Sequence, residues 1–294
     1  MFFLTANAAE AEEVYVHAAR YLGGRDPREL VRNEDTETLH RNKVAQIVCV
    51  SQALAMAAAL RDAWPARMLV AGYSVGEVAA WSVSGLINAA VTLDLVARRA
   101  EIMDAAAMPG DGLISVRGLS RTAIDEMCVH HSVAIAIVNP SESFVLGGEG
   151  EALARLAAEA KARGAVRVTR IAVNVASHTP RLAAASAEFR KALQIAPIRS
   201  IASATARLFS GIDGTAVQDT AVGKDKLAAQ IAHTVEWASC LEGCVEAGAN
   251  AFLELGPGTA LSKMVADVYP EIPSRSCEDF RSLEGIRAWC ASRF

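Results

Sequence analysis

Ser74 lies in a pattern typical of a catalytic nucleophile. The run Gly72-Tyr73-Ser74-Val75-Gly76 follows a short apolar stretch, 68–71, and precedes an alanine-rich stretch that continues to Leu86. This pattern predicts a buried strand, a tight turn at the two glycines and then a helix. Such an arrangement is a nucleophile elbow, which projects the serine hydroxyl out of the sheet. The helix N-terminus directs backbone N–H groups at the reacting atoms, so the Val75 N–H is the candidate oxyanion-hole donor. The alternative is a simple turn, but such a pattern rarely falls by chance between a strand and a helix.

A nucleophilic serine needs a base within hydrogen-bond reach. The chain has six histidines: His17, His40, His130, His131, His178 and His233. His178 lies in a predicted loop where it could face the elbow, although a loop histidine taken alone is more often solvated or a cap. His130 and His131 are expected at the surface, and His233 is a weaker candidate for the cleft.

Arg98 and Arg99 lie in a predicted helix, 89–107. A guanidinium binds a carboxylate through two parallel hydrogen bonds, so an arginine near Ser74 would favour an acyl group that ends in a free carboxylate. The ordinary interpretation of such a pair is a solvated helix face.

Composition excludes several classes of protein. The net charge of −4 and the pI near 5.9 leave no basic surplus for binding nucleic acid. No apolar run reaches the roughly 18 residues that span a bilayer, and no secretory signal is visible, so we expect a cytoplasmic location and no membrane partner. Six scattered cysteines without metal-finger spacing predict free thiols and no metal site.

The order of predicted elements indicates an α/β fold in three segments. Residues 1–110 and 175–294 form an α/β-hydrolase-like main domain with a parallel sheet that carries the elbow. Between them, residues 111–174 have the order β-α-β-β-α-β, which predicts an inserted ferredoxin-like subdomain.

Individual elements of the main domain are also predicted. Short strands are expected at Met1–Thr5 and Ile198–Ala204, and a buried strand at Ala251–Leu255. Pro180 is expected in the first turn of a helix that runs towards Leu193.

Five motifs occur in the order of a known family. They are Gly-Tyr-Ser-Val-Gly-Glu at 72–77, Arg-Arg-Ala-Glu-Ile-Met at 98–103, Val-Asn-Pro-Ser-Glu-Ser-Phe-Val-Leu-Gly-Gly at 138–148, Val-Ala-Ser-His at 175–178 and Glu-Leu-Gly-Pro-Gly at 254–258. With them, nearly the whole chain resembles the malonyl-CoA:acyl-carrier-protein transacylase family.

The resemblance implies an acyltransferase that moves malonyl from malonyl-CoA, through a malonyl-serine, to the prosthetic-group thiol of an acyl carrier protein, with no bound cofactor. It implies that Ser74 and His178 are catalytic and that Arg99 binds the malonyl carboxylate. Gln230 aligns with a glutamine near the catalytic histidine, and Asn139 with a turn that faces the cleft. An ordinary helix glutamine and an ordinary turn remain the alternatives for these two.

Two features depart from the family pattern. The family takes a second oxyanion-hole donor from an N-terminal Gly-Gln-Gly loop that this sequence lacks. Either the start is truncated or Met1–Asn7 supplies a replacement, and the loss of such a donor costs on the order of 10²- to 10³-fold in rate. In addition, Tyr73 replaces the usual histidine, which resembles the epsilon-subunit branch of malonate decarboxylase. That branch implies other decarboxylase subunits as partners and a carrier with a phosphoribosyl-dephospho-coenzyme A group.

Three alternatives remain. A fatty-acid or polyketide malonyl transacylase would use the same residues with another carrier. A serine esterase or thioesterase would need a buried carboxylate against His178, in the chain order serine, acid, histidine. A scaffold subunit without catalysis would not need an ordered contact between Ser74 and His178.

Overall fold

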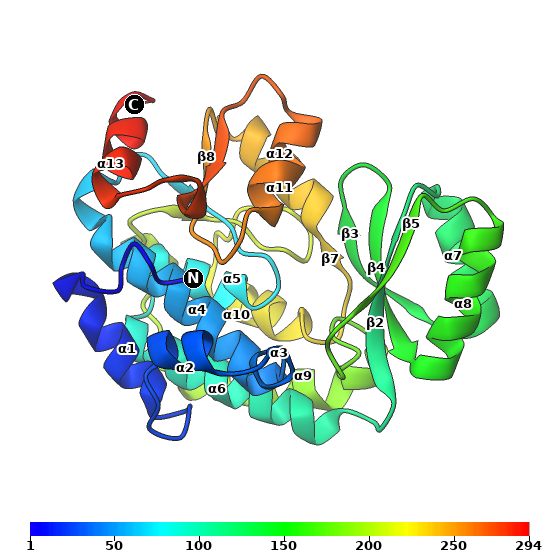
Figure 1. Ribbon diagram of the computed structural model, residues 1–294. Coiled ribbons are helices and arrows are strands. Elements are labelled where there is room, and N and C mark those ends of the chain that lie inside the picture. The colour runs from blue at the N-terminus through cyan, green and yellow to red at the C-terminus, as the bar shows by residue number, and fades with distance from the viewer. Residues whose placement is uncertain (294) are drawn as a thin grey trace.

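The structure, a computed structural model, describes residues 1–293 and has two lobes (Figure 1). The larger lobe carries both termini and most of the helices, and the smaller lobe is a sheet covered on its outer face by two helices. The helices are α1 (Glu12–Ala19), α2 (Pro27–Asn33), α3 (Thr36–Leu39), α4 (Asn42–Ala59), α5 (Gly76–Val83), α6 (Ala89–Ala106), α7 (Arg121–His131), α8 (Gly150–Ala162), α9 (Ala183–Ile195), α10 (Thr220–Ala229), α11 (Trp237–Glu246), α12 (Ala260–Val268) and α13 (Leu283–Ala291).

The strands are short in the larger lobe and longer in the smaller one. They are β1 (Leu69–Val70), β2 (Asp111–Arg117), β3 (Ala134–Asn139), β4 (Ser143–Glu149), β5 (Arg167–Ile171), β6 (Arg207–Leu208), β7 (Val235–Glu236), β8 (Phe252–Glu254) and β9 (Ser274–Ser276). Short 3₁₀ helices lie at Ala9–Ala11, Arg61–Ala63, Pro180–Leu182, Ile201–Ser203 and Cys277–Asp279.

The smaller lobe has the element order predicted from the sequence, β2-α7-β3-β4-α8-β5. Its strands lie in the order β5-β2-β4-β3, all antiparallel, and β7 from the larger lobe adds a fifth strand parallel to β3. The two helices bury their apolar faces on one side of this sheet, in a cluster that includes Ile124, Leu146 and Leu156. That the segment 111–174 is a separate domain stays a prediction.

The larger lobe corrects the expectation of one continuous parallel sheet. Apart from β7, its strands form two separate parallel pairs, β1 with β6 and β8 with β9. A cavity of about 1290 Å³ lies between the pairs and is lined by residues of both β1 and β8. Strands in the middle of a parallel sheet are normally buried on both faces, whereas Leu69, Val70 and Leu253 are only half-buried here.

Two further predictions of strands were wrong. Met1–Thr5 forms turns, because the Phe2 N–H bonds the Gln52 side chain, 2.6 Å away, and no neighbouring strand pairs with the segment. The segment 198–204 contains a 3₁₀ helix capped by Ser200. Pro180 does begin a helical turn that leads into α9, as predicted.

The helices around the elbow pack as a layer. Helices α1, α4, α5, α6 and α9 contact one another and share the main hydrophobic core, which includes Trp81, Leu93 and Phe189. Helix α6 begins at an N-cap in which the Asn88 side chain accepts from the Val91 N–H at 2.8 Å. In the part of the chain that the structure describes, no helix is long and apolar enough to cross a membrane.

Candidate active site

Ser74 lies in the turn between β1 and α5, in the conformation of a nucleophile elbow. Its φ is +53°, a left-handed value that costs energy for a residue with a side chain and that concentrates at functional sites. Gly72 allows this turn, because a Cβ there would lie 2.1 Å from both the Glu77 nitrogen and the Gly76 carbonyl carbon. A Cβ on Gly76 would have no such neighbour within 4 Å, so only the first glycine of the motif is required by packing.

We therefore expect the two glycines to respond differently to the same substitution. Gly72→Ala pushes a methyl group into backbone and should destabilise the fold by about 3 kcal/mol or more. Gly76→Ala, in the first turn of α5, should change stability by less than about 1 kcal/mol, since alanine favours a helix. Urea unfolding of both variants tests this, and equal effects would contradict the account of the turn.

His178 meets Ser74 although the two are 104 residues apart. The Ser74 Oγ and the His178 Nε2 are 2.8 Å apart. The loop that carries His178 is fixed by its backbone, whose N–H donates to the Ile231 carbonyl at 2.8 Å, and the residue has a φ of +62°. The predicted nucleophile and the predicted base are thus in hydrogen-bond contact.

The second ring nitrogen determines the tautomer of His178. Nδ1 lies 2.5 Å from the backbone carbonyl oxygen of Gln230, which can only accept, so Nδ1 carries the proton and Nε2 is free to accept the serine proton. Burial, aided by the positive charge of Arg99, lowers the pKa of His178 to about 3. The imidazole is therefore neutral at pH 7, which a general base requires.

Gln230 and Glu77 lie behind the histidine and position it. Gln230 is fully buried, and its side-chain Nε2 donates to Glu77 Oε2 at 2.5 Å. The Gly211 N–H donates to the same oxygen at 3.0 Å. The backbone carbonyl of Gln230 thus holds the His178 ring, while the side chain of Gln230 is held by Glu77. The motif at 72–77 contains Glu77, whose role was not predicted from the sequence. The signal that could have revealed it is a carboxylate directly before the apolar run 78–81.

Burial raises the pKa of Glu77 to about 7, which predicts a pH-dependent stability. A raised carboxyl pKa means that the folded state binds more protons than the unfolded state, so stability falls as pH rises from about 4.5 through 7. Glu77→Gln keeps the acceptor but removes this ionisation. The variant should therefore gain about 3 kcal/mol relative to the unmodified chain between pH 5 and 8. Urea unfolding at pH 5 and pH 8 tests this, and Glu13→Gln, at an exposed position, is the matched control. The same change in the free energy of unfolding with pH for the unmodified chain and both variants would contradict the prediction.

Arg99 is buried, with 1% of its surface exposed, on the inner face of α6. Its Nη1 donates to Gln46 Oε1 at 2.6 Å, whereas Nε and Nη2 have no partner among the residues that the structure describes. Burial lowers the pKa of Arg99 to about 10, so the guanidinium stays charged at pH 7. The free Nε–Nη2 edge is the one that grips a carboxylate through two hydrogen bonds. Gln46, not anticipated from the sequence, fixes the opposite edge.

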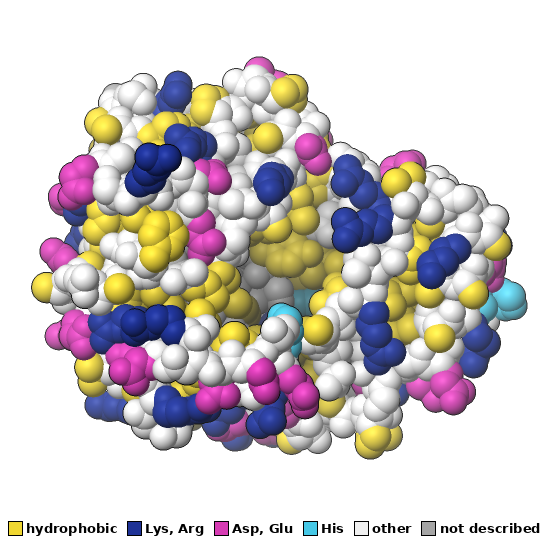
Figure 2. All heavy atoms as spheres, in the orientation of Figure 1, with side chains coloured by type: hydrophobic (Ala, Val, Ile, Leu, Met, Phe, Trp, Pro, Cys, Tyr) yellow, Lys and Arg dark blue, Asp and Glu magenta, His cyan; other side chains and the backbone are white. Residues whose placement is uncertain are grey.

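Val75 and Asn139 flank the elbow. The backbone N–H of Val75, at the N-terminus of α5, has no hydrogen-bond partner within residues 1–293, as an oxyanion-hole donor requires. Asn139 is buried at the end of β3, and its Oδ1 has no hydrogen-bond partner among the described residues. The ring of Tyr73, the residue before the nucleophile, packs edge-on against Trp237. The structure thus brings Ser74, Val75 and His178 together at the elbow and places Gln230 behind His178. Arg99 lies near enough for its charge to lower the pKa of His178. Figure 2 shows the surface hollowed between the two lobes, with hydrophobic side chains at the bottom of the hollow.

In the described chain, no other histidine and no cysteine forms a hydrogen bond with Ser74 or His178, although Cys49, Cys244 and Cys290 line the cavity that Ser74 borders. His130 is exposed and His131 is paired with Glu159 at 2.6 Å; these three form the one cluster with metal-ligand spacing in the described chain, and Arg163 also binds Glu159 at 2.6 Å. His233 is exposed. All six cysteines are free, as predicted, and five of them are buried.

Comparison with known proteins places this arrangement in a family. A family model described as "Acyl transferase domain" matches residues 24–282. The malonyl CoA-acyl carrier protein transacylase of Salmonella typhimurium is 29% identical over 278 residues, covering 90% of this chain and 87% of that protein. The protein of the same name from Mycobacterium bovis is 30% identical over 220 residues, with coverage of 74% and 71%.

Solved structures agree with the sequence matches. An acyl-carrier-protein S-malonyltransferase from Burkholderia pseudomallei superimposes with a TM-score of 0.87 at 26% identity, over 96% of this chain and 93% of that one. A malonyl-transacylase in complex with a type II PKS acyl-carrier protein shares the fold, with a TM-score of 0.88 at 24% identity, over 97% of this chain and 94% of that one. With an ordered serine-histidine pair at its elbow and a family match over most of its length, this chain belongs to the acyl transferase domain family and is an acyltransferase.

Proposed function

We propose that this chain transfers a malonyl group from malonyl-CoA to the thiol of an acyl carrier protein through a malonyl-Ser74 intermediate. The observation that carries the proposal is the buried Arg99 guanidinium, whose charge acts on His178 and whose Nε and Nη2 have no partner among the described residues. A buried cation with two unpartnered donors lowers stability, so its presence favours a ligand that supplies a carboxylate. Malonyl offers that carboxylate and acetyl does not.

The residues at the site supply each step of the transfer. His178 Nε2 takes the Ser74 proton as Oγ forms a bond to the thioester carbonyl carbon, and the oxygen that becomes negative accepts from the Val75 N–H. The carbon–sulfur bond then breaks, the coenzyme A thiolate takes the proton from His178, and malonyl-Ser74 remains, held by Arg99. A carrier thiol gives its proton to His178 and attacks the ester, which reverses the sequence and restores Ser74.

The partner of His178 argues against a serine hydrolase. Nδ1 bonds a backbone carbonyl, whereas the esterase alternative called for a buried carboxylate in that place. The nearest acid in the network, Glu77, reaches His178 only through Gln230. The ordered contact between Ser74 and His178 likewise argues against a scaffold subunit without catalysis.

The identity of the carrier is the finer part of the proposal. Relatives named malonyl CoA-acyl carrier protein transacylase favour an acyl carrier protein of fatty-acid or polyketide synthesis. Tyr73, which stands where the common transacylases have histidine, is the feature that favours the malonate decarboxylase epsilon role. We propose the acyl carrier protein as the acceptor and keep the decarboxylase carrier as the second candidate. Asn139 is proposed to face the acyl group or the pantetheine arm.

Discharge of the acyl-enzyme tests this function. The chain loaded with malonyl-CoA is freed of excess donor and mixed with holo-acyl carrier protein, with a malonate decarboxylase carrier, or with buffer alone. Rapid transfer to the acyl carrier protein and slow release of malonate in buffer are expected. Transfer only to the decarboxylase carrier would assign the chain to that branch, and fast hydrolysis in buffer would indicate a thioesterase.

A further inference from the structure

The loop that carries His178 is held by both lobes. On the side of the larger lobe, the His178 N–H donates to the Ile231 carbonyl at 2.8 Å, and the ring bonds the Gln230 carbonyl at 2.5 Å. On the side of the smaller lobe, the residues that follow His178 contact strands β2 and β4. The position of the histidine ring therefore depends on the smaller lobe as well.

Thr179, the residue after His178, packs against strand β4. It is fully buried, and its hydroxyl donates to the Ala176 carbonyl at 2.7 Å, which closes the loop around His178. Gly147 of β4 leaves room for the Thr179 methyl group, because a Cβ at Gly147 would lie only 2.7 Å from Thr179 Cγ2. The same Cβ would lie 2.8 Å from Leu113 Cδ2, the far end of a flexible side chain. A side chain at position 147 would therefore displace Thr179, whose hydroxyl is fixed.

An ion pair holds the next part of the same loop. Arg181 lies in the 3₁₀ helix Pro180–Leu182, and its Nη2 is 2.7 Å from Asp111 Oδ1. Asp111 is the first residue of β2 and is 1% exposed. Because a buried carboxylate needs a charged or hydrogen-bonding partner, this pair fastens the loop to the strand. The smaller lobe thus contacts the chain at 179 and 181, just after His178.

We propose that Thr179 is a positioning residue, through which β4 of the smaller lobe keeps the His178 ring in place against Ser74. The inference rests on the proposed role of His178 as the general base of acyl transfer. Proton transfer requires Ser74 Oγ and His178 Nε2 to stay at hydrogen-bond distance, 2.8 Å here, and a misplacement of about 1 Å can cost on the order of 10²-fold in rate. Thr179 acts through the backbone that it shares with His178.

A pair of substitutions that restores the fit tests the inference. Gly147→Ala adds a methyl group that must displace Thr179, so it should slow single-turnover loading of malonyl by about tenfold or more. The malonyl-CoA concentration that gives half the maximal rate should not change. Thr179→Ser removes the clashing methyl but keeps the hydroxyl, and should slow loading by no more than about threefold. Gly147→Ala with Thr179→Ser should load within about threefold of Thr179→Ser.

The proton on His178 Nδ1 gives a second readout. It is hydrogen-bonded to the Gln230 carbonyl, and its NMR signal, assigned by its absence from His178→Ala, reports the position of the ring without any substrate. The signal should shift in Gly147→Ala and return in the double variant. Failure of the unmodified chain to load malonyl would refute the proposed function, whereas a rate and a signal that Gly147→Ala leaves unchanged would refute only the positioning role.

The next residue of β4 supplies the matched control. A Cβ at Gly148 would lie 3.4 Å from Val133 Cγ2 and has no atom of the His178 loop among its nearest neighbours. Successive residues of a strand face opposite sides of the sheet, so Gly148→Ala adds its methyl group away from Thr179. This variant should leave both the loading rate and the His178 signal unchanged.

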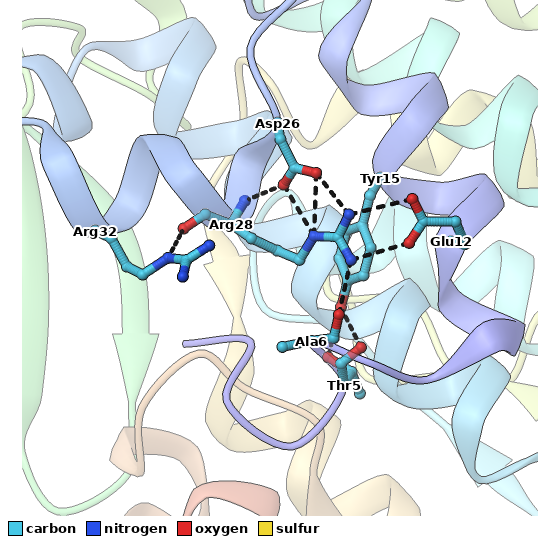
Figure 3. Close-up of polar contacts among 7 residues, drawn as sticks. All are labelled: Thr5, Ala6, Glu12, Tyr15, Asp26, Arg28 and Arg32. Carbon is cyan, nitrogen blue, oxygen red and sulfur yellow. Dashed lines mark hydrogen bonds and ion pairs between the residues drawn. The ribbon is translucent and has the colours of Figure 1, made fainter.

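A polar network in the larger lobe supplies a control for lost stability, and Figure 3 shows it. The Tyr15 hydroxyl contacts the buried Thr5 hydroxyl at 2.6 Å, and Arg28 covers the Tyr15 ring at 4.3 Å and donates to the Ala6 carbonyl at 2.7 Å. Tyr15→Phe removes a buried hydrogen bond and should lower the Tm. Within residues 1–293, Tyr15 forms no hydrogen bond with the loop 176–182, so its loss should leave the His178 signal unchanged.

Two results would overturn the inference. One is a Gly147→Ala chain that, like Tyr15→Phe, has a lower Tm but an unchanged loading rate and His178 signal. The other is a slow Gly147→Ala chain that Thr179→Ser does not rescue, which would assign the loss to β4 or Leu113. If Gly147→Ala does not fold, Thr179→Val decides. It keeps the shape of threonine but loses the bond to the Ala176 carbonyl, so loading should slow by about fivefold or more, and an unchanged rate would overturn the inference.

Discussion

His178→Ala is expected to lower the rate of malonyl transfer to Ser74 by about 10³- to 10⁴-fold, because the variant has no acceptor for the serine proton. Nε2 lies 2.8 Å from Oγ, and the low pKa of the imidazole keeps it neutral at pH 7. Single-turnover loading from malonyl-CoA, followed by rapid quench, measures the rate.

The exposed His233→Ala provides the matched control and should load within twofold of the unmodified chain. Added imidazole should restore part of the loading rate of His178→Ala, since it can supply the lost base. It should not change the loading rate of His233→Ala. A rate for His178→Ala within tenfold of the unmodified chain would remove the histidine from the mechanism.

Arg99→Gln is expected to abolish the preference for malonyl. The free Nε–Nη2 edge is a cationic fork and belongs to the one arginine that is buried in the described chain. Loss of a buried charged pair costs about 3–5 kcal/mol, or on the order of 10²- to 10⁴-fold in kcat/KM for malonyl-CoA. Acetyl-CoA does not use the fork, so its slow reaction should change little. Competition between the two donors, read from the acyl group on the enzyme, measures the ratio.

The neighbouring Arg98 supplies the control, because it lies on the same helix but is exposed. Arg98→Gln should retain the malonyl preference. Arg99→Gln should also keep or raise the Tm, since it removes a buried charge with unpartnered donors. A retained malonyl preference in Arg99→Gln would refute the role of the fork.

Much of the site follows from sequence because its positions depend on local geometry. Gly72 and Ser74 lie in the strand-turn-helix unit that a nucleophile elbow requires. The structure contains this unit, with no room for a Cβ at Gly72 and a left-handed φ at Ser74. His178 could be found only through the resemblance, because the contact with Ser74 joins residues 104 apart and depends on how the two lobes pack. Arg99 and Arg98 are alike in sequence; burial of one face of α6 distinguishes them.

The failures have a common physical origin. A short segment forms a strand only if a neighbour pairs with it, and periodicity does not reveal the neighbour. Met1–Thr5 is apolar but bonds a side chain of α4. A parallel sheet was predicted for the main domain, whereas β1 and β8 belong to two separate parallel pairs with a cavity between them. Glu77 and Gln46 escaped notice because their roles depend on buried partners distant in the chain.

The central claim is that Ser74 carries a malonyl group during transfer. Its most direct test is the intact mass of the chain after brief exposure to malonyl-CoA, with acetyl-CoA and the Ser74→Ala variant alongside. We expect one malonyl adduct per chain, little adduct from acetyl-CoA and none on Ser74→Ala. A malonyl adduct that persists on Ser74→Ala, or no adduct on the unmodified chain while transfer proceeds, would contradict it.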